Sequence, residues 1–135
     1  MNKKRISSNR IIRLAPNEIF VFGSNLQGMH GGGAARMAYE SFGAVWGKGV
    51  GLYGQSYAIP TMQGGVETIK PYVDDFLLFA KRHSELEFLV TEIGCGIAGF
   101  TPYDIAPLFF LAIEDDFKNV YLPESFYVVY ENYYE

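Results

Sequence analysis

The chain has 135 residues, of which 49% are apolar and 16% aromatic, a composition typical of one folded domain and not of a disordered chain. A chain of this length can bury a core without disulfides, and its single cysteine excludes an internal disulfide framework. The formal net charge of −4 disfavours a nucleic-acid-binding protein, since such proteins usually present a basic face. The apolar runs are far shorter than the ~20 residues that a membrane-spanning helix needs.

The two ends of the chain carry opposite charge. We interpret residues 1–13 as a basic N-terminal arm and residues 126–135 as an aromatic and acidic tail, both solvated. An arm that contacts RNA or DNA is the alternative. Because no apolar segment follows the basic start, it does not fit a signal peptide, and a cytoplasmic protein is the simplest prediction.

The first half of the chain alternates between strand and helix patterns. Residues 19–22 form a short apolar run typical of a buried strand, and residues 34–42 predict a helix with a small-residue face that suits close packing on a sheet. Residues 45–54 are rich in glycine and predicted to be irregular. Residues 56–59 predict a second strand, which ends at a proline.

The second half continues this alternation. Apolar residues recur at helical spacing from Ile69 to Ala80, and Pro71 is expected in the first turn of that helix, where its missing N–H does no harm. Residues 88–93 predict a buried strand, residues 104–117 a third helix, and residues 120–122 a last strand. Residues 126–130 fit either a strand or a helix.

This order of elements predicts an α/β fold, in which helices cover both faces of a sheet. Ligands of such folds bind beyond the carboxyl ends of the strands. Two glycine-rich loops, residues 31–33 and 94–99, each follow a strand and precede a helix. We therefore expect the two loops to form one shared site.

Glycine-rich loops before helices suit a phosphate group. Glycine lets the backbone come close to a ligand, and a helix N-terminus adds N–H donors and partial positive charge. Neither loop contains lysine or arginine, and no Walker lysine is present, so ordinary ATP or GTP hydrolysis is disfavoured. The expected ligand is a diphosphate bound mainly through the backbone.

The second loop spells G-x-G-x-x-G, the dinucleotide-binding fingerprint. Three features disfavour a Rossmann fold. The motif arrives late in the chain, residues 101–103 separate it from the next helix, and the acidic cluster at residues 114–116 precedes the following strand instead of following it. We therefore interpret the loop as a phosphate-binding turn of a different fold.

Three motifs occur in a fixed order: IFVFGSN at residues 19–25 with GGGAA at 31–35, GQSYAIP at 54–60, and GCGIAGF at 94–100. Over residues 19–113 this order resembles the macro domains, and more closely a macro-like branch of small bacterial or phage proteins. The resemblance implies a three-layer α/β/α sandwich with a mixed central sheet, and binding of ADP-ribose or a related nucleotide.

The resemblance also implies roles for individual residues. Asn25 would lie near the distal ribose, the two loops would hold the diphosphate, and Phe100 would pack against the distal sugar. The Gly-Asp-Ile motif that grips adenine in this family is absent, and Asn17 and Glu18 are the candidates to replace its aspartate. The expected ligand-binding residues are Gly23, Ser24, Asn25, Gly31, Gly32, Gly33, Ala34, Gly94, Cys95, Gly96, Ile97, Ala98, Gly99 and Phe100.

Asn25 and His30 are the candidate catalytic residues if the protein hydrolyses an ADP-ribose conjugate. Asn25 would orient a water or the ribose, and His30 would assist proton transfer because histidine titrates near neutrality. Each has a structural alternative: Asn25 as a turn residue, and His30 as a residue that fixes its loop or faces solvent. A small cysteine-dependent hydrolase or transferase is a second hypothesis, with Cys95 near two helix N-termini that would lower its thiol pKa and His30 as its base.

A third hypothesis is a non-enzymatic bacterial or phage protein associated with nucleic acid through its basic start. Two histidines and one cysteine, far apart in sequence, give no support for a metal site, and no cofactor is expected. The expected partner is an ADP-ribose-like small molecule. Tyrosines near the C-terminus would either form a homo-oligomer contact or cover an edge of the domain itself.

Overall fold

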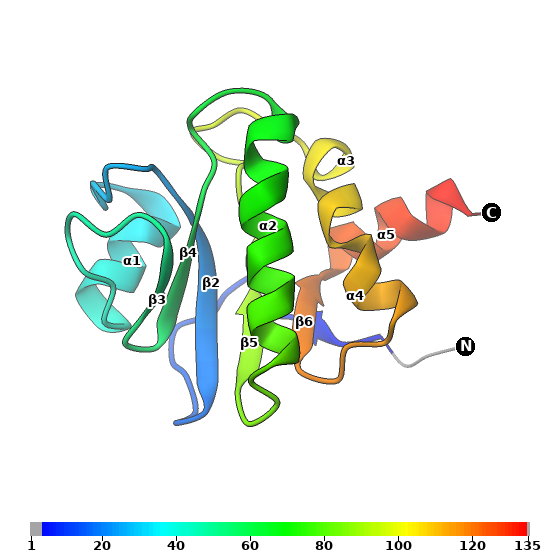
Figure 1. The fold of residues 1–135 in the computed structure, drawn as a ribbon, viewed down its shortest axis with the longest axis horizontal. Coiled ribbons are helices and arrows are strands. Elements are labelled where there is room, and N and C mark those ends of the chain that lie inside the picture. The colour runs from blue at the N-terminus through cyan, green and yellow to red at the C-terminus, as the bar shows by residue number, and fades with distance from the viewer. Residues whose placement is uncertain (1–3, 135) are drawn as a thin grey trace.

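A mixed sheet of six strands forms the centre of the molecule (Figure 1). The computed structural model of the chain describes residues 4–134. The strands are β1 (Ile6–Ser7), β2 (Glu18–Ser24), β3 (Gly51–Tyr53), β4 (Ser56–Pro60), β5 (Glu87–Val90) and β6 (Val120–Pro123). They lie in the order β1-β6-β5-β2-β4-β3, and all neighbours are parallel except the antiparallel pair β3 and β4.

Helices cover both faces of this sheet, which confirms the α/β fold predicted from the order of elements. They are α1 (Gly33–Ser41), α2 (Val66–Lys81), α3 (Pro102–Ile105), the 3₁₀ helix η1 (Ala106–Phe109), α4 (Phe110–Glu114) and α5 (Glu124–Tyr133). Among the residues that the structure describes, no helix combines the length and the apolar character needed to cross a membrane.

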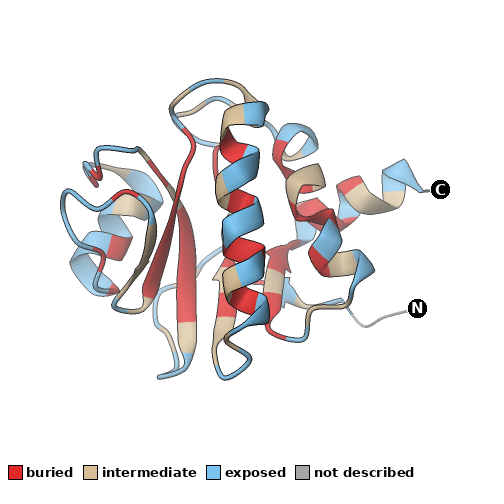
Figure 2. Cartoon of the chain, viewed as in Figure 1, coloured by how far each residue is buried: buried red, intermediate tan, exposed pale blue. Residues whose placement is uncertain are grey.

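Strand β2 faces a separate core on each side. Ile19 and Val21 belong to the larger core, which includes side chains of α2, η1, α4 and α5. Phe20 and Phe22 belong to the smaller core, which includes Ala38 of α1. The split follows from strand geometry, because successive side chains point to opposite faces of the sheet. Figure 2 shows β2 and β4 buried along most of their length, with buried residues of α2 alternating with exposed ones.

The face with the smaller core has a thinner cover. Of the helices in residues 4–134, only α1 contributes to this core, and the chain between β1 and β2 adds Ile11 and Leu14. The opposite face carries α2 and the C-terminal helices. The uneven cover leaves cavities beside α1, and these are described below.

The predicted third helix, residues 104–117, is wrong in its bounds and its continuity. Helix α3 begins at Pro102, because Thr101 and Asp104 form a reciprocal capping box at its N-terminus. Pro107 lacks the N–H that a regular α-helix uses, and the chain forms the 3₁₀ turn η1 before it resumes as α4.

The expected position of Pro71 in a first turn is also wrong. Helix α2 begins at Val66, so Pro71 lies in its interior. Pro71 is exposed, and the hydrogen bond that it cannot make lies on the solvent side of the helix. The buried stripe of α2 includes Ile69, Val73 and Phe76, as the helical spacing predicts.

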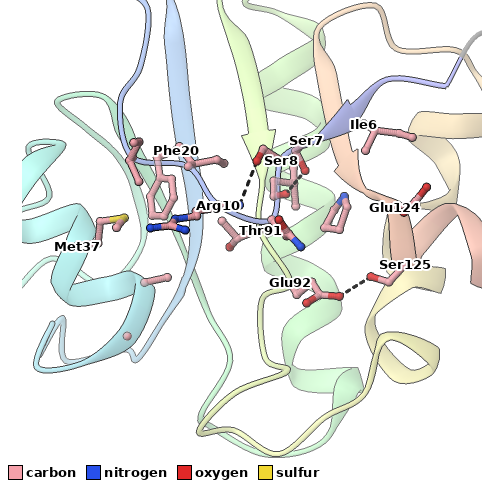
Figure 3. Close-up of a pocket in the computed structure, with 17 residues that line it drawn as sticks. Ile6, Ser7, Ser8, Arg10, Phe20, Met37, Thr91, Glu92, Glu124 and Ser125 are labelled. Carbon is pink, nitrogen blue, oxygen red and sulfur yellow. Dashed lines mark hydrogen bonds between the residues drawn. The ribbon is translucent and has the colours of Figure 1, made fainter.

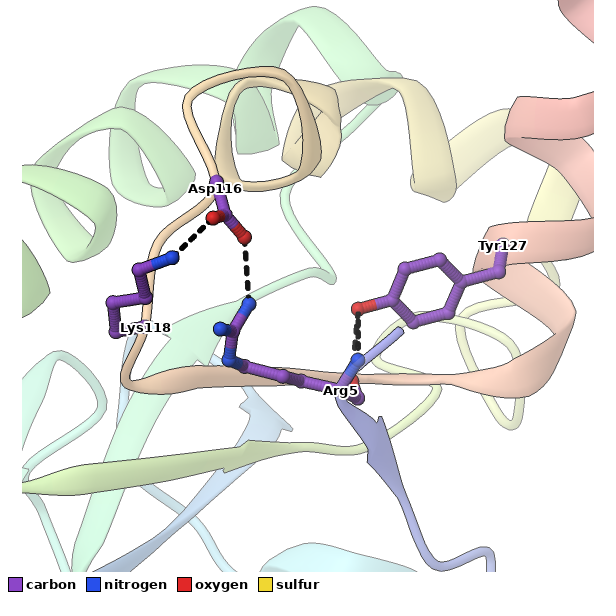
Figure 4. A network of polar contacts seen from close by, with 4 residues as sticks. All are labelled: Arg5, Asp116, Lys118 and Tyr127. Carbon is purple, nitrogen blue, oxygen red and sulfur yellow. Dashed lines mark hydrogen bonds and ion pairs between the residues drawn. The ribbon is translucent and has the colours of Figure 1, made fainter. Parts of the chain in front are cut away.

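The basic start of the chain is not a free arm where the structure describes it. Ile6 and Ser7 form β1, which pairs in parallel with β6. The Arg5 guanidinium lies 2.7 Å from the Asp116 carboxylate, and the Tyr127 hydroxyl accepts a bond from the Arg5 N–H and donates one to the Arg5 carbonyl (Figure 4). Residues 1–3 of the predicted arm lie outside the described part.

The predicted tail is helical, which decides between the two alternatives for residues 126–130. Its tyrosines pack within the chain: Tyr130 and Tyr133 contact Phe110 with ring centroids 4.9 and 5.3 Å away. The last residue of the predicted tail, at position 135, lies outside the described part. These contacts bury aromatic surface against the domain itself, while the question of a homo-oligomer stays a prediction.

Candidate functional site

The first glycine-rich loop leads into the N-terminus of α1. Gly32 is the N-cap and has an extended backbone, with φ −158° and ψ 167°. No side chain caps this helix, and its first turn contains no acidic residue. The first N–H groups of a helix have no partner within the helix, and they carry partial positive charge. The N-terminus of α1 is therefore available to an anion.

The second loop turns back on itself after β5. Gly94 and Gly99 adopt left-handed conformations, with φ +73° and +84°. Two bonds close the turn: the Phe100 N–H donates to the Gly94 carbonyl at 2.9 Å, and the Gly99 N–H donates to the Gly96 carbonyl at 3.0 Å. Among residues 4–134, the N–H groups of residues 96–98 have no hydrogen-bond partner. The loop thus presents three consecutive free donors.

Both loops line one cleft, with a volume of about 290 Å³. The cleft lies beyond the carboxyl ends of β2, β4 and β5, where ligands of α/β folds bind. The expected ligand-binding residues that line it are Gly23, Ser24, Asn25, Gly32, Gly33, Ala34, Gly94, Gly96, Ile97 and Ala98. The convergence of the two loops, the main geometric expectation from the sequence, is therefore confirmed.

A close contact between two backbones brings the loops together. A Cβ atom on Gly23 would lie 3.2 Å from the amide nitrogen of Gly94 and 3.3 Å from Oγ1 of Thr61. Such distances are shorter than most real Cβ contacts. The absence of a side chain at Gly23 thus allows the second loop to lie against the end of β2.

Three glycines have no explanation within the fold. A Cβ atom on Gly31, Gly32 or Gly96 would meet nothing within 4 Å, and none of these residues has a positive φ. Packing and backbone conformation would therefore both accept a side chain there. The remaining physical reason for glycine is close approach by a group outside the chain, as at phosphate-binding loops.

Asn25 lines the cleft, and its side chain is already bonded to its own loop. Its Nδ2 donates to the Met29 carbonyl at 3.0 Å, and its Oδ1 accepts from the Met29 N–H at 2.8 Å. The pair closes the chain between β2 and the first glycine-rich loop, which is the structural role that asparagine often has at turns. Contact between Asn25 and a ligand stays a prediction.

His30 is buried, with 1% of its surface exposed, and does not line the cleft. Its Nε2 lies 3.0 Å from the Val45 carbonyl and 3.2 Å from the Lys48 carbonyl. Two carbonyl acceptors require that Nε2 carries the proton and donates. Its Nδ1 is buried without a hydrogen-bond partner among the described residues. The placement favours the loop-fixing role over proton transfer, because the ring is buried and away from the cleft surface.

Cys95 does not have the lowered pKa expected from nearby helix N-termini. Burial, together with the nearby carboxylates of Glu92 and Asp104, raises the pKa of its thiol to about 11. The side chain packs against the larger core and does not line the cleft. A protonated thiol turned toward the core disfavours the hypothesis of a cysteine nucleophile.

Three other expected contacts are not on the cleft surface. Phe100 packs against the larger core, where it supports the turn of the second loop instead of covering a sugar. Gly31 and Gly99 belong to the loops without lining the cleft. Most of the residues that do line the cleft are glycine, alanine, serine or threonine, so backbone atoms and small side chains form most of its surface.

Neither candidate for the missing adenine contact is near the cleft. Glu18 begins β2, and its carboxylate accepts a bond from the Ala15 N–H at 2.8 Å. Asn17 precedes it, at the amino end of the strand. The cleft lies at the opposite end of β2, and neither residue lines the cleft or the larger cavity described below, so their contact with adenine stays a prediction without support from the geometry.

A larger cavity of about 920 Å³ adjoins the cleft (Figure 3). Its walls come from the chain around β1, from α1, and from the ends of β5 and β6. The lining residues common to both spaces are Gly33, Ala34, Thr91 and Glu92. The cleft and the cavity thus form neighbouring parts of one depression beside α1.

Sequence reasoning missed Arg10 and Glu92, two charged residues of this depression. Arg10 lay in the segment interpreted as a free arm, and its place beside Phe20 depends on β1 joining the sheet. Glu92 had a detectable signal, because it follows a predicted strand and immediately precedes the second loop. No group of three or more potential metal ligands gathers within residues 4–134.

Comparisons of the chain with protein-family models, with curated proteins and with solved structures found no match.

Proposed function

We propose that this chain binds ADP-ribose or a related nucleotide that contains a diphosphate. The observation that carries the proposal is the convergence of two glycine-rich loops on one cleft, with lining glycines at positions 32 and 96 that the fold itself does not require. Free N–H groups of residues 96–98 and of the first turn of α1 supply the donors that a diphosphate needs.

The charge of the cleft favours backbone recognition. Its lining contains no lysine or arginine and one carboxylate, that of Glu92, so the partial positive charge available to a diphosphate comes from the α1 N-terminus and the loop amides. The adjoining cavity supports a ligand larger than pyrophosphate, since its volume of about 920 Å³ lies within the range of small-molecule sites. In this proposal the diphosphate occupies the cleft and the nucleoside occupies the larger cavity.

Binding, and not hydrolysis, is the proposed activity. The amide of Asn25 is bonded to Met29 at both ends, and His30 is buried with its proton donated to backbone carbonyls. The two residues that the sequence suggested for catalysis are therefore engaged in holding the loop. A general base must come within hydrogen-bond reach of the proton that it takes.

Calorimetric titration with ADP-ribose, AMP and NAD tests the proposal. We expect ADP-ribose to bind with the highest affinity, because it combines the diphosphate with room at both ends. Gly32→Ala and Gly96→Ala should leave the melting temperature unchanged, since their Cβ atoms meet nothing, and should weaken ADP-ribose binding at least tenfold.

Gly65→Ala is the matched control for these variants. Gly65 has φ −72° and lies outside the cleft, and its added Cβ would meet only the end of the exposed Glu67 side chain. This variant should bind ADP-ribose like the wild type. A wild-type protein without affinity for ADP-ribose, or unchanged binding by both cleft variants, would contradict the proposal.

A further inference from the structure

Glu92 is the one carboxylate that lines both the cleft and the larger cavity among residues 4–134. It follows Thr91 at the end of β5 and comes directly before the turn of the second loop. Its side chain is exposed. Any ligand with a diphosphate in the cleft and a nucleoside in the cavity must pass beside this residue.

The carboxylate of Glu92 is held on one side only. The Ser125 hydroxyl, in the first turn of α5, donates to Oε2 of Glu92 at 2.5 Å (Figure 3). Within the described chain, Oε1 has no hydrogen-bond partner, and no lysine, arginine or histidine lies within 4.0 Å. One acceptor oxygen therefore remains free in the depression.

A free carboxylate beside a diphosphate site has a defined chemical preference. It repels further negative charge, and it accepts hydrogen bonds from neutral hydroxyl groups. The ribose of a nucleoside lies between the base and the 5′-diphosphate, and its 2′ and 3′ hydroxyls are donors. An acidic side chain serves this purpose at the ribose of other dinucleotide sites.

We propose that Glu92 accepts hydrogen bonds from the ribose hydroxyls of the bound nucleoside and so makes the site selective for unmodified ribonucleoside diphosphates. A 2′-deoxyribose would leave the carboxylate without its donor, and a 2′-phosphate would place a second negative charge against it. Ser125 is a positioning residue, because its hydroxyl fixes the direction of the carboxylate. The inference rests on the proposed function and names the selectivity of the same site.

Competition between ADP and 2′-deoxy-ADP measures the preference directly. The wild type should bind ADP about tenfold more tightly than 2′-deoxy-ADP, since a site built to bond a hydroxyl rejects the analogue that lacks it. In Glu92→Ala the two affinities should become equal. Ser125→Ala should reduce the preference to an intermediate ratio while the melting temperature stays at the wild-type value.

Glu85→Ala is the matched control, because Glu85 is an exposed carboxylate that lines neither the cleft nor the larger cavity. It should retain the tenfold preference. Glu92→Gln tests the repulsion: it should raise the affinity for ADP-ribose 2′-phosphate relative to ADP-ribose at least threefold.

Three results would be decisive against the inference. Equal binding of ADP and 2′-deoxy-ADP by a wild type that binds ADP-ribose overturns the role of Glu92 and leaves the proposed function standing. A preference that persists in both Glu92→Ala and Ser125→Ala does the same. A wild type that binds neither ADP nor ADP-ribose removes the proposed function, and the inference with it.

Discussion

Gly23 at the end of β2 and Gly94 in the second loop lie so close that a methyl group on Gly23 would come within 3.2 Å of the Gly94 amide nitrogen. Gly23 lies in β2 and Gly94 in the connection that follows β5, and these two strands are parallel neighbours. Their contact sets the distance between the two loops. The width of the cleft thus depends on the absence of a side chain at Gly23.

Substitution of Gly23 by valine should therefore damage both stability and binding. Valine places its branched side chain against the Gly94 backbone and Thr61, and overpacking of this kind costs about 1–3 kcal/mol. Urea unfolding monitored by circular dichroism measures the loss, and calorimetry with ADP-ribose measures the binding. A Gly23→Val protein with wild-type values in both would show that the contact does not set the cleft.

His30→Ala should loosen the first loop. The change removes a buried side chain and the bond from Nε2 to the Val45 and Lys48 carbonyls, a loss of about 2–4 kcal/mol. His30→Gln, which retains a side-chain donor, should recover part of the stability. An alanine variant with the wild-type melting temperature would contradict the loop-fixing role.

Cys95 should react slowly with iodoacetamide at neutral pH. Burial raises the pKa of its thiol to about 11, and the reactive form is the thiolate. The alkylation rate should rise with pH through the range below 11, as long as the protein stays folded. If Cys95 were alkylated at pH 7 faster than a small free thiol, the hypothesis of a cysteine nucleophile would be restored.

The ion pair of Arg5 and Asp116 should make stability depend on pH. Hydrogen bonds from Lys118 and Arg5 lower the pKa of Asp116 below its ordinary 3.8, so the carboxylate contributes stability above pH 3.8 and loses it as pH falls through the lowered pKa. Asp116 has φ 49°, a conformation that asparagine also tolerates.

Asp116→Asn should therefore isolate the effect of the charge. The variant should melt at a lower temperature than the wild type at pH 7, and the difference should vanish below the pKa of Asp116. Thermal unfolding at several pH values tests this. A difference of the same size at pH 7 and pH 2 would indicate that the charge contributes nothing.

Much of the fold follows from apolar patterning. The strands β2, β4, β5 and β6 and the helices α1 and α2 carry patterns long enough to be predicted. The short strands β1 and β3 do not, since two or three residues carry no measurable alternation and their pairing depends on distant neighbours. The break at Pro107 shows a local proline effect that apolar content alone did not reveal.

The shared cleft was predictable because two loops in the same strand-to-helix context must meet at one edge of a parallel sheet. The orientation of single side chains was not. The side chains of Phe100 and Cys95 pack against the larger core because the loop turns tightly at Gly94 and Gly99. The amino-acid sequence of the loop does not specify this turn. Arg10 entered the depression only through the pairing of β1 with β6.

Amide chemical shifts of ¹⁵N-labelled protein during titration with ADP-ribose test the central claim most directly. If one diphosphate binds both loops, the amides of residues 32–34 and 96–98 should shift together and saturate at the same dissociation constant. Shifts confined to one loop, or shifts of the two loops with different dissociation constants, would contradict a shared diphosphate site.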